Sequence, residues 1–145
     1  MDENTYRSPT ERVEVWLDAS TLHIRFNNPA RLNALSVDMW EAVPVLLAAK
    51  AEGDDRVRMV VFSGAGEKAF VSGADISQFE DMRAAREAVA RYEIIAEAAL
   101  TAIYRFSKPT LACIRGFCVG GGINVSISCD LRIASSDSVF FIPAA

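Results

Sequence analysis

The chain has 145 residues, of which 51% are hydrophobic and 23% charged, enough apolar material for one buried core and too much for a disordered chain. The net charge is -4, and no basic run or row of aromatics interleaved with Lys and Arg occurs, so we expect no nucleic-acid partner. The polar, acidic first residues contain no apolar segment, so we expect no signal peptide, no transmembrane helix or membrane partner, and a cytoplasmic protein.

The first third of the chain predicts a hairpin, a loop and a helix, after a polar N-terminal segment over residues 1–11. Apolar residues alternate on both sides of a turn at residues 18–20, which is typical of a β-hairpin. The Asn-Pro content of NNPARLNAL indicates a loop. A helix is expected from Ser36, a candidate N-cap, with a bend or interruption at Pro44.

The middle of the chain predicts a buried strand, a loop and one long helix. The β-branched run VRMVVFSG favours the strand, and AGEKAFVSGADI follows as a glycine-punctuated loop with a short extended centre. Apolar side chains then recur in steps of three and four, the stripe of an amphipathic helix. Its members are Met82, Ala85, Val89, Tyr92, Ala96, Ala99, Ile103 and Phe106. The opposite face carries charges of both signs at Arg83, Glu87 and Arg91, so it does not suit a membrane surface.

The last third predicts a strand after Pro109, a glycine turn, a short helix and one or two further strands. Ile123 and Ile127 lie one helical turn apart directly after the glycines, which indicates that the turn opens the helix. Strands that alternate with helices predict one α/β domain with right-handed crossovers, over residues 12–145. The apolar ending FFIPAA carries no cap or polar tail, so we expect the chain to be a fragment.

The run Gly120 to Gly122 requires an explanation, because consecutive glycines lose more backbone entropy on folding than other residues. A dinucleotide fingerprint is weakly supported, since Val125 stands at its third glycine and no acidic residue follows at the ribose-binding distance. A P-loop fails, because Gly122 and Ile123 occupy the places of its Lys and Ser or Thr. A tight turn from strand to helix and a ligand that approaches the main chain remain as alternatives.

A second glycine loop, FVSGADI, also follows a buried strand. Two strand ends therefore present glycine-flanked amides, which could converge on a single oxygen atom. Two converging amides make an oxyanion hole, and an amide at a helix start gains from the helix dipole. Such a site suits a thioester, whose α-carbon becomes acidic once the carbonyl oxygen can accept enolate charge.

Three segments together resemble the crotonase superfamily, the enoyl-CoA hydratase/isomerase family, in order and spacing: NNPARLNALS, KAFVSGADI and KPTLACIRGFCVGGGINVSISCDLRIAS. The resemblance implies an α/β crotonase-like spiral of ββα units that assembles as a homotrimer or hexamer. The family's C-terminal helical part has no counterpart in this chain. The substrate implied is an acyl-CoA thioester, with coenzyme A bound as part of the substrate and no tightly bound cofactor or metal.

The resemblance makes the amides of Ala74 and Gly121 the oxyanion-hole donors. It makes the Ala30–Ala34 loop and the Ser72–Ile76 loop the walls for coenzyme A. Arg31 either contacts a phosphate of coenzyme A or is only a solvated loop charge. The full set of expected substrate-binding residues is Ala30, Arg31, Leu32, Ala34, Ser72, Gly73, Ala74, Asp75, Ile76, Phe117, Val119, Gly120 and Gly121. Asp75 is expected to hold its loop by bonding nearby amides, and Asp130 to anchor the turn after the short helix.

The acid and base of the family's hydratases are missing. The resemblance places their two glutamates at Asn124 and Ala144, and neither side chain exchanges a proton near neutral pH. We therefore expect an acyl-CoA enzyme of the lyase or isomerase class with little hydratase activity. The alternative is a non-catalytic acyl-CoA-binding or assembly protein.

A catalytic triad and a zinc or disulfide site are not favoured. The chain has no G-x-S-x-G elbow, and its one histidine, His23, lies far upstream of the glycine run. The three cysteines have no CxxC spacing, so we expect buried free thiols, including Cys118 beside the glycines.

Overall fold

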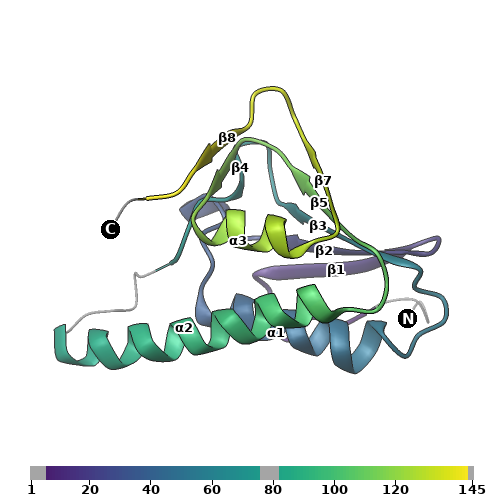
Figure 1. The fold of residues 1–145 in the computed structure, drawn as a ribbon, viewed down its shortest axis with the longest axis horizontal. Coiled ribbons are helices and arrows are strands. Elements are labelled where there is room, and N and C mark those ends of the chain that lie inside the picture. Colours follow the sequence, from purple (N-terminus) through teal and green to yellow (C-terminus); the bar gives the residue numbers. More distant parts are fainter. Residues whose placement is uncertain (1–5, 76–81, 144–145) are drawn as a thin grey trace.

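The computed structural model describes residues 6–75 and 82–143 (Figure 1). In chain order the strands and main helices are β1 (Val13–Asp18), β2 (Thr21–Phe26), α1 (Val37–Leu46), β3 (Met59–Gly64), β4 (Ala69–Val71), α2 (Met82–Arg105), β5 (Thr110–Ile114), β6 (Phe117–Val119), α3 (Gly121–Ser128), β7 (Leu131–Ala134) and β8 (Val139–Phe141). A short 3₁₀ helix, η1 (Pro29–Arg31), and a π-helical turn, η2 (Leu47–Ala51), complete them.

The strands form two sheets, one of five strands in the order β1-β2-β3-β5-β7 and one of three in the order β4-β6-β8. Among the described strands β1 and β2 pair antiparallel and the other pairs are parallel, so the predicted α/β class is confirmed. Consecutive strands alternate between the two sheets from β3 onward, which places the ends of β4 and β6 next to each other. Figure 1 shows α1 and α2 beneath the strands, with α3 between α2 and the smaller sheet.

The predicted hairpin, the strands at residues 59–64 and 110–114, and the helix after the glycine run are all present. The segment after Asp130 forms two strands, and the segment before the glycine run forms β6, which the sequence did not indicate. In the hairpin the side chains that point away from the core stack on one another: the rings of Trp16 and His23 lie 4.8 Å apart with their planes 3° from parallel.

The helix that begins after Ser36 passes through Pro44 and changes only after Leu46, where the π-helical turn η2 follows. Proline has no N–H for the carbonyl one turn back, and its ring crowds that carbonyl, so a wider turn just beyond it is the expected distortion. Ser36 occupies the N-cap position, but its hydroxyl donates to the Asp38 carboxylate and makes no bond to a helix amide.

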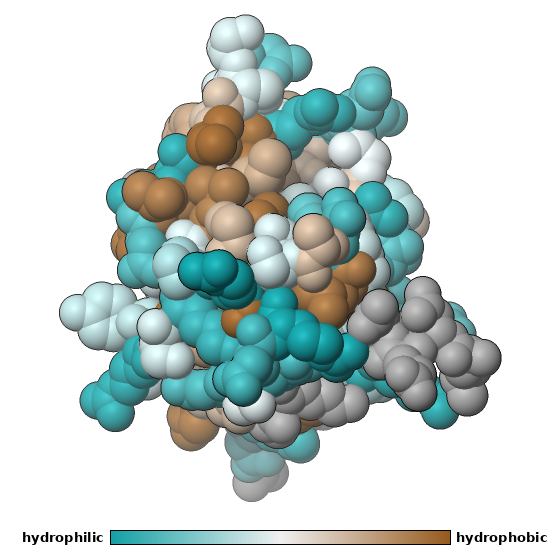
Figure 2. All heavy atoms as spheres, turned by 90° about the vertical axis from the view of Figure 1, so that its right-hand side faces the viewer, coloured by the Kyte–Doolittle hydropathy of each residue, from teal (hydrophilic) through white to brown (hydrophobic). Residues whose placement is uncertain are grey.

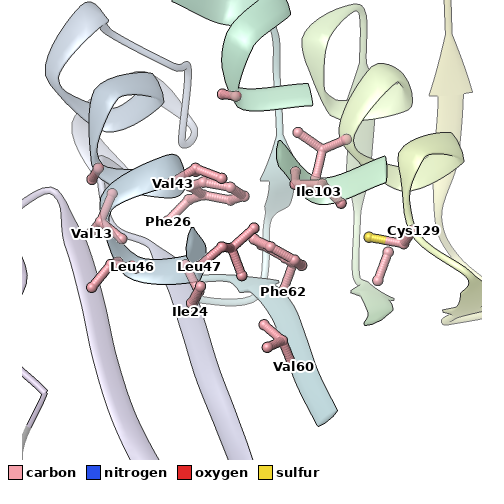
Figure 3. Close-up of a cluster of buried hydrophobic side chains, with 14 of the residues drawn as sticks. Val13, Ile24, Phe26, Val43, Leu46, Leu47, Val60, Phe62, Ile103 and Cys129 are labelled. Atoms are coloured by element: carbon pink, nitrogen blue, oxygen red, sulfur yellow. The ribbon is translucent and has the colours of Figure 1, made fainter. Parts of the chain in front are cut away.

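The core lies between the helices and the inner face of the five-stranded sheet (Figure 3). It includes Ile24, Phe26, Trp40, Val43, Leu46, Leu47, Val60, Phe62 and Ile103. The α2 stripe joins this core from Tyr92 onward: Ala99 and Ile103 are buried and Tyr92 is partly buried, whereas Val89 is 42% exposed. No helix among the described residues is long and apolar enough to cross a membrane.

Large apolar side chains are exposed near the end of the described chain. They are Ile127, Leu131, Ile133, Val139, Phe140, Phe141 and Ile142, on α3, β7, β8 and the residue after β8. Figure 2 shows apolar side chains gathered on the upper part of one face of the molecule. Patches of this kind on a protein surface are typical of contacts with further polypeptide.

Candidate functional site

The loop after β4 is held by both backbone groups of Leu35. The Leu35 amide donates to the Gly73 carbonyl at 2.8 Å, and the Asp75 amide donates to the Leu35 carbonyl at 3.0 Å. Leu35 and Ala74 thus form a parallel β-bridge, in which the hydrogen bonds are made by Leu35 and by the two neighbours of Ala74. In such a bridge the residue between the two bonded neighbours, here Ala74, points its N–H and C=O away from the partner segment. The Ala74 amide therefore faces away from Leu35.

The other glycine loop leads directly into α3. Gly120 has φ 54° and ψ -110°, a conformation for which glycine is suited, and its carbonyl accepts the amides of Ile123 and Asn124. Gly121 is the first residue of the helix, so its amide has no carbonyl partner within the helix. A Cβ atom built on Gly120 would lie 3.9 Å from Cα of Gly73, so the two loops lie side by side.

A pocket of about 260 Å³ opens where these loops meet α2. Its lining residues are Trp40, Ala74, Tyr92, Glu93, Ala96, Glu97, Leu100, Gly121 and Asn124. The structure thus brings together three residues that the sequence singled out, Ala74, Gly121 and Asn124. The contribution of α2 was missed, although Glu93 and Glu97 flank stripe positions Tyr92 and Ala96, a signal that could have placed them beside the core face.

Trp40 and Tyr92 fix the floor of this pocket. The indole Nε1 of Trp40 donates to the Tyr92 hydroxyl at 2.7 Å, and that hydroxyl donates to the Leu35 carbonyl at 2.7 Å. Burial is the main cause that raises the pKa of Tyr92. A Cβ atom on Gly121 would lie 3.2 Å from the Trp40 ring. This aromatic pair is therefore tied to Leu35, which holds the loop after β4, and its Trp40 ring lies close to Gly121.

We expect Tyr92→Phe to lower the free energy of unfolding by about 1–2 kcal/mol, because it leaves the Trp40 indole N–H and the Leu35 carbonyl each without this partner. The measurement is urea unfolding followed by fluorescence. Tyr104→Phe is the matched control, since Tyr104 lies on the same helix and is 77% exposed. Equal midpoints for the two variants would contradict a structural role for the Tyr92 hydroxyl.

The two loops expected to form the coenzyme A walls are fastened to each other. Ser72 Oγ donates to the Arg31 carbonyl at 3.0 Å, and Asn28 Nδ2 donates to the Asp75 carboxylate at 3.2 Å. The buried Asn33 links the two ends of the turn between β3 and β4, because its Nδ2 donates to the carbonyls of Ala65 and Ala69. A second pocket of about 240 Å³ lies beside the first loop, and its lining includes Leu32, Glu67 and Lys68.

The remaining expected binding residues are scattered. Ala30, Arg31 and Leu32 are exposed, whereas Ala34 is 8% exposed and packs inside its loop. Phe117 and Val119 are not among the described residues that line the pocket at the glycine loops. Ile76 and Ala144 lie outside the described residues.

Asp130 anchors the turn after α3, as expected. Its carboxylate accepts the amide of Thr110 at 2.9 Å, and the Thr110 hydroxyl accepts the Asp130 amide at 2.9 Å. Cys118 and Cys129 are buried, and burial raises the pKa of the Cys118 thiol to about 11, which makes it a poor nucleophile. Cys113 is exposed, so the expectation of a buried thiol there was wrong: in β5 alternate side chains point away from the core, and Cys113 lies between the buried Ala112 and Ile114.

Comparison with known proteins identifies the family. A family model described as enoyl-CoA hydratase/isomerase matches residues 21–145. The chain belongs to the enoyl-CoA hydratase/isomerase family. A short-chain-enoyl-CoA hydratase of Clostridium acetobutylicum is 36% identical over 120 residues, which cover 83% of this chain and 45% of that relative. A peroxisomal Delta(3,5)-Delta(2,4)-dienoyl-CoA isomerase of Arabidopsis thaliana is 36% identical over 135 residues, which cover 86% of this chain and 48% of the relative.

The fold agrees with this family. A crystal structure of an enoyl-CoA hydratase/carnithine racemase from Magnetospirillum magneticum superposes with a TM-score of 0.86 at 31% identity. The match covers 97% of this chain and 52% of that structure. The expected crotonase-like α/β fold is therefore confirmed, and the chain spans about half the length of the relatives that it matches.

Proposed function

We propose that the protein acts on acyl-CoA thioesters and stabilises a thioester enolate with the backbone amides of Ala74 and Gly121. The observation that carries this proposal is the pocket at the glycine loops, since both residues line it. The Ala74 amide faces away from Leu35, and the Gly121 amide begins α3 without a helical partner. Two such donors on one thioester oxygen, assisted by the helix dipole, favour the enolate over the neutral ester.

The acyl chain enters the same pocket in this proposal. Trp40, Ala96 and Leu100 offer it apolar walls. The nucleotide half of coenzyme A lies along the Ala30–Ala34 and Ser72–Ile76 loops, and the cations nearest these loops in sequence are Arg31 and Lys68. Lys68 lines the pocket beside the first loop, which makes it a second candidate partner for a CoA phosphate.

The reaction in this proposal is one other than hydration by paired glutamates: isomerisation, decarboxylation, thioester hydrolysis or another enolate reaction. Asn124 lines the pocket where the hydratases carry one of these groups, and an amide cannot take a proton from water. The same observation favours the second candidate, an acyl-CoA-binding protein that retains the oxyanion hole without turnover. Turnover against a panel of acyl-CoA thioesters separates the two.

Assembly as a homotrimer or hexamer is the quaternary structure that we propose from the family resemblance. The exposed apolar side chains of β7 and β8 support it, because they offer a surface for further polypeptide. The net charge of -4 and the absence of a basic run support small acyl-CoA ligands rather than nucleic acid as partners.

We expect the protein to bind butyryl-CoA and not free butyrate, because most of the proposed contacts are made with the nucleotide half. Isothermal titration calorimetry measures both ligands. Arg31→Ala and Lys68→Ala should each weaken binding of butyryl-CoA, whereas Arg58→Ala, at the opposite end of β3 from these loops, should not. Equal and negligible binding of both ligands by a folded sample would rule out the acyl-CoA site.

A further inference from the structure

Two carboxylates of α2 line the pocket that also holds both proposed oxyanion donors. Glu93 and Glu97 share this pocket with Ala74, Gly121 and Asn124. They lie four residues apart in α2, so their side chains lie on one helix face, one turn apart. Helix α2 packs against α3, which carries Gly121 at its start.

Neither carboxylate has a neutralising partner in the part of the chain that the structure describes. Glu93 and Glu97 make no ion pair and no hydrogen bond there, whereas the ion pairs that do occur lie on other elements. Like charges four residues apart destabilise a helix slightly. Both glutamates are exposed, so they lie where α2 borders the open side of the pocket, and pairing them adds nothing to helix stability.

The rest of the described lining offers no other candidate proton acceptor. Trp40, Ala96 and Leu100 have no basic atom, and Asn124 has an amide. Tyr92 uses its hydroxyl hydrogen to bond the Leu35 carbonyl, and its pKa is raised above the ordinary value of 10.0, chiefly by burial. The proton acceptors of this pocket are thus the two carboxylates.

We propose that Glu93 and Glu97 are the proton-transfer groups of this site, in place of the glutamates that Asn124 and Ala144 replace. This assignment rests on the acyl-CoA function proposed above. One carboxylate oxygen takes a proton from C2 of the acyl group, the C–H electron pair forms the C1=C2 bond, and the carbonyl pair moves to the oxygen held by the two amides. The same carboxylic acid returns the proton to C2, or to C4 when a 3-enoyl group becomes a 2-enoyl group, so the carboxylate is regenerated and no other reactant is needed.

The test is the exchange of the C2 protons of butyryl-CoA in deuterated water, followed by proton NMR and by the mass of the recovered thioester. The unmodified protein should catalyse exchange, and Glu93→Gln combined with Glu97→Gln should lower the rate by about 10²–10⁴-fold, the usual contribution of a general base. Glutamine keeps the shape of the side chain, so binding of butyryl-CoA measured by calorimetry should survive. Glu87→Gln on the same helix is the matched control, since Glu87 is not among the described residues that line the pocket.

Three results would overturn the assignment. Unchanged exchange in the double variant would place the base elsewhere. Binding of butyryl-CoA without any exchange by the unmodified protein would show that these carboxylates do not reach C2, although the acyl-CoA site itself would stand. Absence of binding would remove the proposed function and this assignment together.

Discussion

Crotonyl-CoA should remain essentially unhydrated in the presence of this protein. Hydration needs a base for the water that attacks C3 and an acid that protonates C2, and each such group contributes about 10²–10⁴-fold. Asn124 is exposed at the pocket and can orient water but cannot take its proton, and Ala144 has no functional group. The residual rate is then that of the oxyanion hole, about 10³–10⁴-fold above water. The proton transfer proposed for Glu93 and Glu97 serves C2 and C4 of the acyl group and leaves the water that attacks C3 without a base.

Restoring both glutamates tests this directly. Asn124→Glu, Ala144→Glu and the double variant are assayed on crotonyl-CoA by loss of the enoyl absorbance, with Asn27→Glu, outside the pocket lining, as the control. We expect a gain confined to the double variant, because an acid without a base, or the reverse, completes only half of the addition. Robust hydration by the unmodified protein would contradict the account of the missing acid and base.

Gly121→Val should lower the rate of C2 exchange by about 10²–10³-fold, the usual cost of removing one oxyanion-hole donor. A Cβ atom at this position would lie 3.2 Å from the Trp40 ring, and Trp40 is 2% exposed and cannot move freely. The first turn of α3 must therefore shift, and the Gly121 amide shifts with it. No charge or side-chain donor is lost, so the effect is steric: the added side chain displaces the Gly121 amide and occupies part of the pocket.

Two other glycines serve as controls for this variant. Gly53→Val should leave exchange and stability unchanged, since a Cβ atom on Gly53 meets nothing within 4 Å. Gly122→Ala should instead destabilise the fold, because its Cβ atom would lie 2.6 Å from the Val71 carbonyl oxygen. Normal exchange by a folded Gly121→Val protein would mean that the oxyanion hole lies elsewhere.

The regular elements were predictable because their local patterns are strong. Alternation in the hairpin, the β-branched run of β3 and the glycines before α3 each determine structure over a few residues, with little help from the rest of the chain. The course of the helix around Pro44 was less predictable. Its distortion appears after Leu46, because packing of Val43 and Leu46 in the core holds the helix through the proline.

The sequence singled out Ala74, Gly121 and Asn124 of the pocket lining but not the residues that α2 contributes. The glycine loops carry a sequence signature, so Ala74 and Gly121 could be named before their common pocket was known. For Glu93 and Glu97 the only signal was their position beside Tyr92 and Ala96 of the apolar stripe, and a charged pair at such a position cannot be told from a solvated face until the neighbouring elements are placed. The link from Trp40 through Tyr92 to Leu35 joins residues more than 50 positions apart and likewise emerges only in three dimensions.

The most direct measurement is a crystal structure of the protein with bound butyryl-CoA. If Ala74 and Gly121 form the oxyanion hole, the thioester oxygen should lie about 2.7–3.1 Å from both of their backbone nitrogens. The account also predicts the acyl chain against Trp40 and Leu100, with C2 facing the Glu93 and Glu97 carboxylates. A thioester bound with its oxygen away from both amides, or coenzyme A bound on another face of the molecule, would contradict it.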